Sequence, residues 1–292
     1  MKFVDDFSHL LVTGELASGA VSRLEAVQGD AEKSSESYVL KTLKTEYQKK
    51  DQVVERFMHE VQVNRFVRHT RLIQPLAVCL NPENPGVLFP LVKGQKLMPW
   101  KFCKQKNAMF SAAVIVQKLL DVVSYLHDDQ GGNSLGYVIH GDIGFNNIHV
   151  GESGELFLLD FGHAHSEMLD PKYKVTPVSI SKGASACMAP ELLQQGVLDR
   201  RIDIYSVGAV LFSLISGRPT FDIPNNQRVV FKQSESGSDS SDNAGELILD
   251  AERMLSEVLE KSLAIDPNDR YQSAKEMNQA ISKMIELTRS SL

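Results

Sequence analysis

The feature that most constrains this chain is the spacing of two aspartates and an asparagine, at Asp142, Asn147 and Asp160. Asp142 is a candidate acceptor for the proton of an attacking hydroxyl, because a positioned carboxylate can act as a general base. Asn147 and Asp160 offer oxygen ligands, which are the donors that Mg²⁺ prefers. This combination predicts a site for a metal and a phosphate.

The sequence between the last two of these residues predicts a β-hairpin. Residues 148–150 and 155–158 read as strands, and Gly151 and Gly154 bound the turn between them. Such a hairpin would bring Asn147 and Asp160 beside each other at its open end. Taken singly, a surface aspartate, an asparagine in a turn and an Asp-Phe-Gly turn would have an ordinary structural explanation.

The ordered set His140-Gly141-Asp142, Asn147 and Asp160-Phe161-Gly162 resembles the catalytic loop (H-R-D-x-x-x-x-N) and D-F-G triplet of eukaryotic-type Ser/Thr protein kinases. The resemblance implies an α+β, bilobal fold with an antiparallel N-lobe sheet, one N-lobe helix and a mainly helical C-lobe. It assigns residues 1–92 to the N-lobe and 93–292 to the C-lobe, with a Ser/Asp-rich insertion at about residues 232–246.

The N-terminal part resembles the nucleotide-binding half of that family. Residues 8–27 read as a hairpin, and Gly14 to Val21 is similar to the G-x-G-x-x-G-x-V loop, with Leu16 in place of the middle glycine. Leu16 predicts a weaker or differently shaped grip on the phosphates. The residues that the resemblance assigns to ATP binding are Gly14, Leu16, Gly19, Val21, Val39, Lys41, Phe89, Pro90 and Val92.

Lys41 lies inside an apolar strand predicted at residues 37–43, so its ammonium needs a partner. The helix predicted at residues 51–68 carries Glu60 where the family places its pairing glutamate. The resemblance therefore implies a Lys41–Glu60 ion pair that directs the lysine to the α- and β-phosphates. Asn64 replaces a usually apolar residue and predicts a weakened helix position.

Residues 72–80 and 87–92 are predicted strands, and the second leads into the link between the lobes. Phe89 lies where the family has the residue that gates the adenine pocket, although ordinary core packing explains it nearly as well. The backbone of Pro90 and Val92 would meet the adenine edge. Pro90 has no N–H, but its carbonyl can still accept a hydrogen bond.

The C-terminal part carries later family motifs in the same order. A helix is predicted at residues 107–128, followed by a surface insertion before the catalytic loop. Ala189-Pro190-Glu191 resembles the A-P-E triplet, and Asp203 to Gly208 resembles the D-x-x-S-x-G helix. Arg270 lies in a D-P-x-x-R segment and is predicted to pair with Glu191.

Several departures from the family concern activity. Gly141 replaces the arginine that clamps a phosphorylated activation loop, so activity should not depend on that switch. Gly144 replaces the lysine that contacts the γ-phosphate, and Ala184, with Ser185 beside it, replaces that lysine's threonine partner. Loss of one charge-stabilising donor typically lowers a rate about 10²–10³-fold. Slow to moderate phosphate transfer is therefore expected.

Composition limits the partners and the compartment. The net charge is −6, which argues against nonspecific binding to nucleic acid or anionic membranes. No apolar run is expected to approach the length of a membrane span, and the first residues lack a signal-peptide core. The widely spaced Cys79, Cys103 and Cys187 indicate reduced thiols. We therefore expect a protein of the cytoplasm, or one delivered to another cytosol. The oligomeric state is not indicated.

The favoured function is an ATP-dependent kinase that uses Mg²⁺ or Mn²⁺ and phosphorylates Ser/Thr of proteins, including itself. The expected roles are general base for Asp142, phosphate binding for Lys41 with Glu60, and metal binding for Asn147 and Asp160. Candidate phosphorylation sites lie at 176–185 and 234–241, although a solvated linker explains the latter as well. The alternatives are a nucleotide-binding pseudokinase that regulates partners and, as His140-Gly141-Asp142 suggests, a small-molecule phosphotransferase.

Overall fold

A computed structural model describes residues 1–29, 37–81, 83–104, 107–128, 136–166, 187–193, 198–218 and 243–290. The predictions made for the insertion at 129–135, for residues 176–185 and for Ser234–Ser241 lie outside the described residues.

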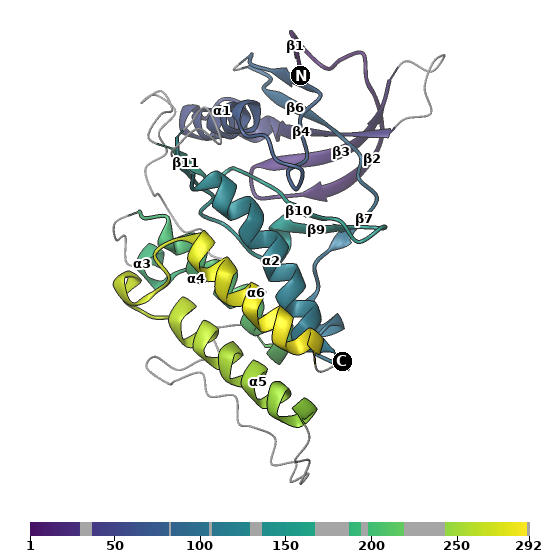
Figure 1. The fold of residues 1–292 in the computed structure, drawn as a ribbon. Coiled ribbons are helices and arrows are strands. Elements are labelled where there is room, and N and C mark those ends of the chain that lie inside the picture. The colour runs from purple at the N-terminus through teal and green to yellow at the C-terminus, as the bar shows by residue number, and fades with distance from the viewer. Residues whose placement is uncertain are drawn as a thin grey trace.

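The N-terminal part is built on a six-stranded sheet with the order β1-β5-β6-β4-β3-β2, which lies at the top of Figure 1. All neighbouring strands are antiparallel except β1 and β5. The strands are β1 (Lys2–Val4), β2 (Leu11–Ser18), β3 (Ser22–Gln28), β4 (Ser37–Leu43), β5 (Ala77–Cys79) and β6 (Gly86–Pro90).

The helix α1 (Asp51–Phe66) packs on this sheet, after the short 3₁₀ turn η1 (Thr45–Tyr47). Its Phe57 and Val61 share one hydrophobic cluster with Leu43 and Val78 of the sheet. This apolar face explains why the segment predicted at 51–68 forms a helix on the sheet. The N-lobe of one sheet and one helix is thus confirmed.

Two small sheets lie in the C-terminal part, within residues 94–166. The first has the order β10-β9-β7, from β7 (Gly94–Lys96), β9 (Ile148–Gly151) and β10 (Leu156–Leu158). The second pairs β8 (Val138–Ile139) with β11 (His165–Ser166). The β9–β10 pair is the hairpin that the sequence predicts, and the backbone N–H of Leu159 donates to the Asn147 carbonyl at 2.8 Å.

The C-terminal part is mainly helical and lies below the sheets in Figure 1. The helix α2 packs against α4 and α6, and α5 packs against α4 and α6. These elements are η2 (Pro99–Lys101), α2 (Ala108–Leu126), η3 (Phe145–Asn147), α3 (Pro190–Leu193), α4 (Arg201–Ser216), α5 (Asn243–Ser262), η6 (Pro267–Asp269) and α6 (Ala274–Ser290).

Helix α2 corrects one prediction from composition. By length and apolar content it could cross a membrane, so the expectation that no apolar run approaches such a span was wrong. Core residues such as Val116, Leu120 and Val123 are fully buried in the structure. Burial inside the C-lobe therefore accounts for its apolar sequence, as for the central helix of many globular domains.

Two strand predictions were too long or too short. The strand expected at 72–80 is only Ala77–Cys79, because residues 73–76 form no ladder and Leu72 makes an isolated bridge to Leu158. Conversely, β2 continues to Ser18, so Gly14 and Leu16 lie within a strand and not in a turn. Register shifts after Val12 and Glu15 accommodate this extension.

Candidate active site

Lys41 is the centre of a buried ion-pair network between β4, α1 and the segment after β10. Its Nζ lies 2.5 Å from Glu60 Oε1 and 3.1 Å from Asp160 Oδ1. The side chains of Lys41 and Glu60 are almost fully buried, whereas that of Asp160 remains 44% exposed. The predicted Lys41–Glu60 contact is confirmed, and Asp160 can turn an accessible carboxylate oxygen toward a ligand.

The contacts in this network shift the pKa values of Lys41, Glu60 and Asp160. Burial alone would lower the pKa of Lys41, but the charges of Asp160 and Glu60 raise it above the ordinary 10.5. Burial, aided by the charge of Asp160 and opposed by Lys41, raises the pKa of Glu60 to about 7. Although burial opposes ionisation, Lys41 and the N–H of Gly162 lower the pKa of Asp160 to about 2.

Asp160 also has an unusual backbone conformation. Among the described residues other than glycine, it alone has a positive φ, of 66°. Such a conformation costs about 1–3 kcal/mol unless surrounding contacts fix it, and it is frequent at functional sites. Its Oδ1 accepts the backbone N–H of Gly162 at 3.0 Å, which supports the conformation.

Asp142 and Asn147 are linked within one short loop. Asn147 Nδ2 donates to both the carbonyl oxygen and Oδ2 of Asp142, each at 2.8 Å. His140 Nδ1 accepts the N–H of Asp142 at 3.3 Å, so its Nε2 carries the proton and donates to the Leu159 carbonyl at 3.1 Å. The loop and the residue before Asp160 are therefore joined through one buried imidazole.

Asp203, at the start of α4, anchors this loop from below. Its carboxylate accepts the N–H groups of His140 and Gly141 at 2.8 and 2.9 Å and contacts His127 Nε2 at 2.9 Å. Burial opposes its ionisation, but these donors hold the pKa of Asp203 below its usual value. The sequence analysis named Asp203 only as part of a motif. A carboxylate in the first turn of an otherwise apolar helix was the signal, because such a group requires buried donors.

Helix α1 makes direct hydrogen-bond contacts with the segment that follows Asp160. Arg56 Nε donates to the Gly162 carbonyl at 2.9 Å, and His59 Nε2 lies 2.7 Å from the Ala164 carbonyl oxygen. Asn64 is buried and donates to the Glu60 carbonyl at 2.9 Å, so it does not prevent the Lys41 contact. Nothing in the sequence distinguishes Arg56 and His59 from ordinary helix residues, so neither was predicted as part of the site.

The glycine-rich stretch lies along the exposed edge of the sheet. Gly14, Leu16 and Gly19 are exposed, and Leu16 falls at a register shift of the β2–β3 pair, with half of its surface in solvent. A side chain on Gly14 would meet no atom within 4 Å. Val21 packs partly against the cluster under the sheet. Leu16 thus places an apolar side chain at a position where the family motif has a glycine, whose backbone can approach the phosphates.

The residues expected at the adenine end lie on neighbouring strands. Val39 of β4 pairs with Phe89 of β6, and Tyr38 pairs with Pro90. Phe89 is half-buried against the core cluster of α1, which agrees equally with gating and with core packing. His149 Nε2, on β9, lies 3.1 Å from the Val92 carbonyl oxygen and ties the interlobe link to the hairpin that bears Asn147.

The donor set suits a magnesium–nucleotide complex better than a metal held by protein alone. Among the described residues, no group of three or more His, Cys, Asp or Glu side chains could enclose an ion. Asp160 offers a carboxylate oxygen 3.1 Å from the Lys41 ammonium, and Asn147 lies on the loop that carries Asp142, so phosphate oxygens and water would complete the coordination of an ion. This fit agrees with ATP and Mg²⁺ as the implied ligands.

The C-lobe contains the predicted pair of Arg270 and Glu191. The guanidinium, with a fully buried side chain, contacts Glu191 Oε1 at 2.6 Å and Oε2 at 2.8 Å. It also donates to the carbonyls of Ala264, Ile265 and Arg201. Two motifs 79 residues apart thus meet as the sequence predicts, with every donor direction of the guanidinium used.

Comparison with known proteins agrees with this architecture. A sequence profile described as "Protein kinase domain" matches residues 12–281. "Serine/threonine-protein kinase H1 homolog" of Danio rerio is 26% identical over 263 residues, which cover 89% of this chain and 58% of that protein. "Serine/threonine-protein kinase PrkC" of Bacillus subtilis is 22% identical over 238 residues, or 82% and 35%. The chain therefore spans little more than half the length of the first relative.

A solved structure shows the same fold. The crystal structure of the PknI kinase domain of Mycobacterium tuberculosis aligns with a TM-score of 0.62 and 21% identity, over 95% of this chain and 96% of that one. At this identity the likeness establishes the fold and not the activity. Because the family profile covers most of the residues and both lobes have the expected elements, this chain belongs to the protein kinase domain family.

Proposed function

We propose that this chain is an ATP-dependent protein kinase that transfers the γ-phosphate to serine or threonine hydroxyls of proteins, including its own. The observation that carries the proposal is the assembly of Lys41, Glu60 and Asp160 in one buried network beside the linked pair Asp142–Asn147. The relatives with Ser/Thr kinase names support it. The buried Arg270–Glu191 pair in the C-lobe favours a protein substrate over a small molecule.

In this mechanism the residues of the chain position the reactants and move one proton. Asp142 accepts the proton of the attacking hydroxyl. The oxygen of that hydroxyl forms a bond to the γ-phosphorus, and the bond between the γ-phosphorus and the β–γ bridging oxygen breaks. Lys41, oriented by Glu60, holds the α- and β-phosphates. Asn147 and Asp160 would hold Mg²⁺ or Mn²⁺, which would neutralise the negative charge that develops on the phosphates.

The resemblance to the kinase motifs assigns the nucleotide contacts beyond this network. We assign Gly14, Leu16, Gly19 and Val21 to the roof over the phosphates. Val39, Phe89, Pro90 and Val92 are assigned to the adenine end. We place the lobe boundary at residues 92/93.

Arg56 and His59 support activity without an activation-loop phosphate, because they already hold α1 against residues 162–164.

Three thiols without disulfides favour the cytoplasm as the compartment.

The test is phosphate transfer from labelled ATP with Mg²⁺ or Mn²⁺ to a generic protein substrate and to the chain itself. Asp142→Asn should lower the rate about 10²–10⁴-fold, since it removes the general base. Asp250→Asn, which alters an exposed carboxylate on α5, is the matched control and should leave the rate unchanged. Saturable ATP binding without transfer would overturn the proposal and support the pseudokinase. Transfer to a small-molecule acceptor but to no protein would support the small-molecule phosphotransferase.

A further inference from the structure

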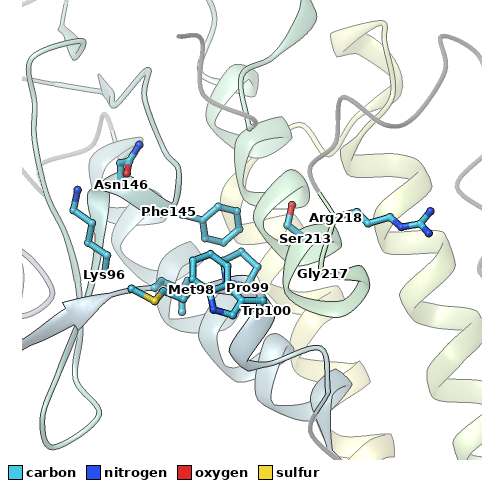
Figure 2. A pocket seen from close by; sticks show the side chains of 10 residues that line it. Lys96, Met98, Pro99, Trp100, Phe145, Asn146, Ser213, Gly217 and Arg218 are labelled. Atoms are coloured by element: carbon cyan, nitrogen blue, oxygen red, sulfur yellow. The ribbon is translucent and has the colours of Figure 1, made fainter. Parts of the chain in front are cut away.

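A pocket lies in the C-lobe, beside the catalytic loop. It has a volume of about 390 Å³. Met98, Pro99 and Trp100 form one side, and Phe145 of η3 faces them across the pocket (Figure 2). Trp100 is 61% exposed. An aromatic ring open to water beside further apolar side chains is a surface that gains free energy when a ligand covers it.

A second observation indicates that a ligand belongs here. Ser213 of α4 lines the pocket and is only 1% exposed, yet its Oγ has no hydrogen-bond partner in the described structure. A serine within a helix usually donates to the carbonyl four residues before it. A buried hydroxyl without such a bond is costly unless something else accepts or donates to it.

The charges at the pocket have one sign. Lys96 and Arg218 lie on opposite sides of the aromatic pair in Figure 2, and both are exposed. The lining includes no carboxylate, and within the described ranges neither cation forms an ion pair. In a chain with a net charge of −6, such a site favours negatively charged ligands over positively charged ones.

The pocket is close to the expected proton acceptor. Phe145 follows Asp142 by three residues, so their Cα atoms are separated by at most about 11 Å. Asn147 Nδ2, bonded to Asp142, closes this loop at 2.8 Å. An extended peptide covers such a distance with about three or four residues. A polypeptide whose hydroxyl lies at Asp142 can therefore place a nearby side chain in the pocket.

We propose that this pocket is a substrate-specificity site of the kinase, an inference that rests on the proposed function. It binds an aliphatic or aromatic side chain that lies about three or four residues from the phosphorylated hydroxyl, between Met98, Trp100 and Phe145. Acidic residues next to that side chain are selected by Lys96 and Arg218.

Binding can be measured without catalysis, because Trp100 is the single tryptophan of the chain. The probes are synthetic peptides without tryptophan or tyrosine that contain one serine. A leucine flanked by aspartates is placed three or four residues before or after it. At least one such peptide should shift the Trp100 emission to shorter wavelength in a saturable manner. Replacing its leucine by alanine should weaken binding about tenfold or more.

The charge contribution is tested by Lys96→Glu, which should weaken the aspartate peptide several-fold and reverse the preference between aspartate and lysine flanks. Lys49→Glu alters an exposed lysine of the N-lobe and is the control. An emission spectrum that no peptide changes overturns the proposal. Equal affinity for the leucine and alanine peptides, or an unchanged charge preference in Lys96→Glu, also overturns it.

Kinetics then separate this proposal from the kinase assignment. With wild-type protein, the leucine–aspartate peptide should have a KM at least tenfold below that of the alanine peptide. Trp100→Ala should remove this difference, whereas Phe3→Ala, a similarly exposed aromatic on β1, should preserve it. Transfer to all peptides with equal KM overturns the pocket but leaves the kinase. Absence of transfer to any substrate overturns the proposed function, and the emission titration still decides whether the pocket binds.

Discussion

A Cβ atom on Gly141 would lie 2.6 Å from the carbonyl oxygen of His163. Gly141 has φ of +76°, so this approach of the catalytic loop to the segment after Asp160 requires a residue without a side chain. The position that in related kinases carries an arginine is thus adapted to direct backbone packing. Restoring the arginine would break this contact and would not recreate a phosphate clamp.

Gly141→Ala should therefore destabilise the fold by about 2–4 kcal/mol, from strain at positive φ together with the steric overlap. Urea unfolding measures the change, and kcat should fall because Asp142 is displaced. Gly154→Ala is the matched control, since it has φ of +86° but no atom within 4 Å of the added carbon. It should cost only about 1 kcal/mol. Equal effects of both substitutions would show that the His163 contact is not the cause.

The pKa of Glu60 predicts a pH dependence of nucleotide use. Because this pKa is raised to about 7, Glu60 becomes protonated as the pH falls below 7 and no longer holds Lys41 through a charge. For the free enzyme, kcat/KM for ATP should fall toward acid with a midpoint near pH 7. Asp160, whose pKa is about 2, stays ionised throughout this range.

Glu60→Gln tests the assignment. The amide cannot titrate, so the variant should have a low kcat/KM for ATP without the midpoint near pH 7. Glu46→Gln, on the exposed turn η1, should keep both the wild-type value and the profile. A midpoint that persists in Glu60→Gln would assign the titration to another group.

Asp203→Asn should destabilise the protein and slow catalysis. The two carboxylate oxygens accept the backbone N–H groups of His140 and Gly141. In asparagine one of these oxygens becomes an NH₂ group, which cannot accept, so at least one backbone N–H loses its acceptor. Leaving buried donors without an acceptor costs about 1–3 kcal/mol each. Chemical denaturation should show this loss, together with a lower kcat at unchanged KM for ATP. Asp199→Asn, at a partly exposed carboxylate just before α4, should lose less than 1 kcal/mol.

Arg270→Lys should cost about 2–4 kcal/mol of unfolding free energy. The lysine cannot make the two parallel contacts to Glu191 or reach three carbonyls, and its charge stays buried. Thermal or urea unfolding measures the loss. Arg253→Lys, with a side chain 72% exposed on α5, should change stability by less than 0.5 kcal/mol. A similarly small loss in Arg270→Lys would mean that the pair is not structurally important.

The sequence by itself determined the elements whose signals are local. Alternation of apolar residues and the turn at Gly151 and Gly154 predicted the β9–β10 hairpin, and that hairpin fixed the relation of Asn147 to Asp160. A lysine in an apolar strand requires a partner, and the resemblance to the kinase family assigned that role to Glu60. The resemblance of two segments to family motifs predicted the pairing of Arg270 with Glu191, and a buried pair of this kind requires that both charges be satisfied.

Contacts in which one partner belongs to no motif were settled only by long-range packing. Arg56 and His59 read as ordinary helix residues, and their carbonyl partners on residues 162 and 164 depend on how α1 docks. The pocket between Trp100, Phe145 and Ser213 arises from three separate elements. Local periodicity specifies a residue's own element and the face that it buries. The partner across an interface depends on where long-range packing places the other elements, and no single stretch of sequence encodes that.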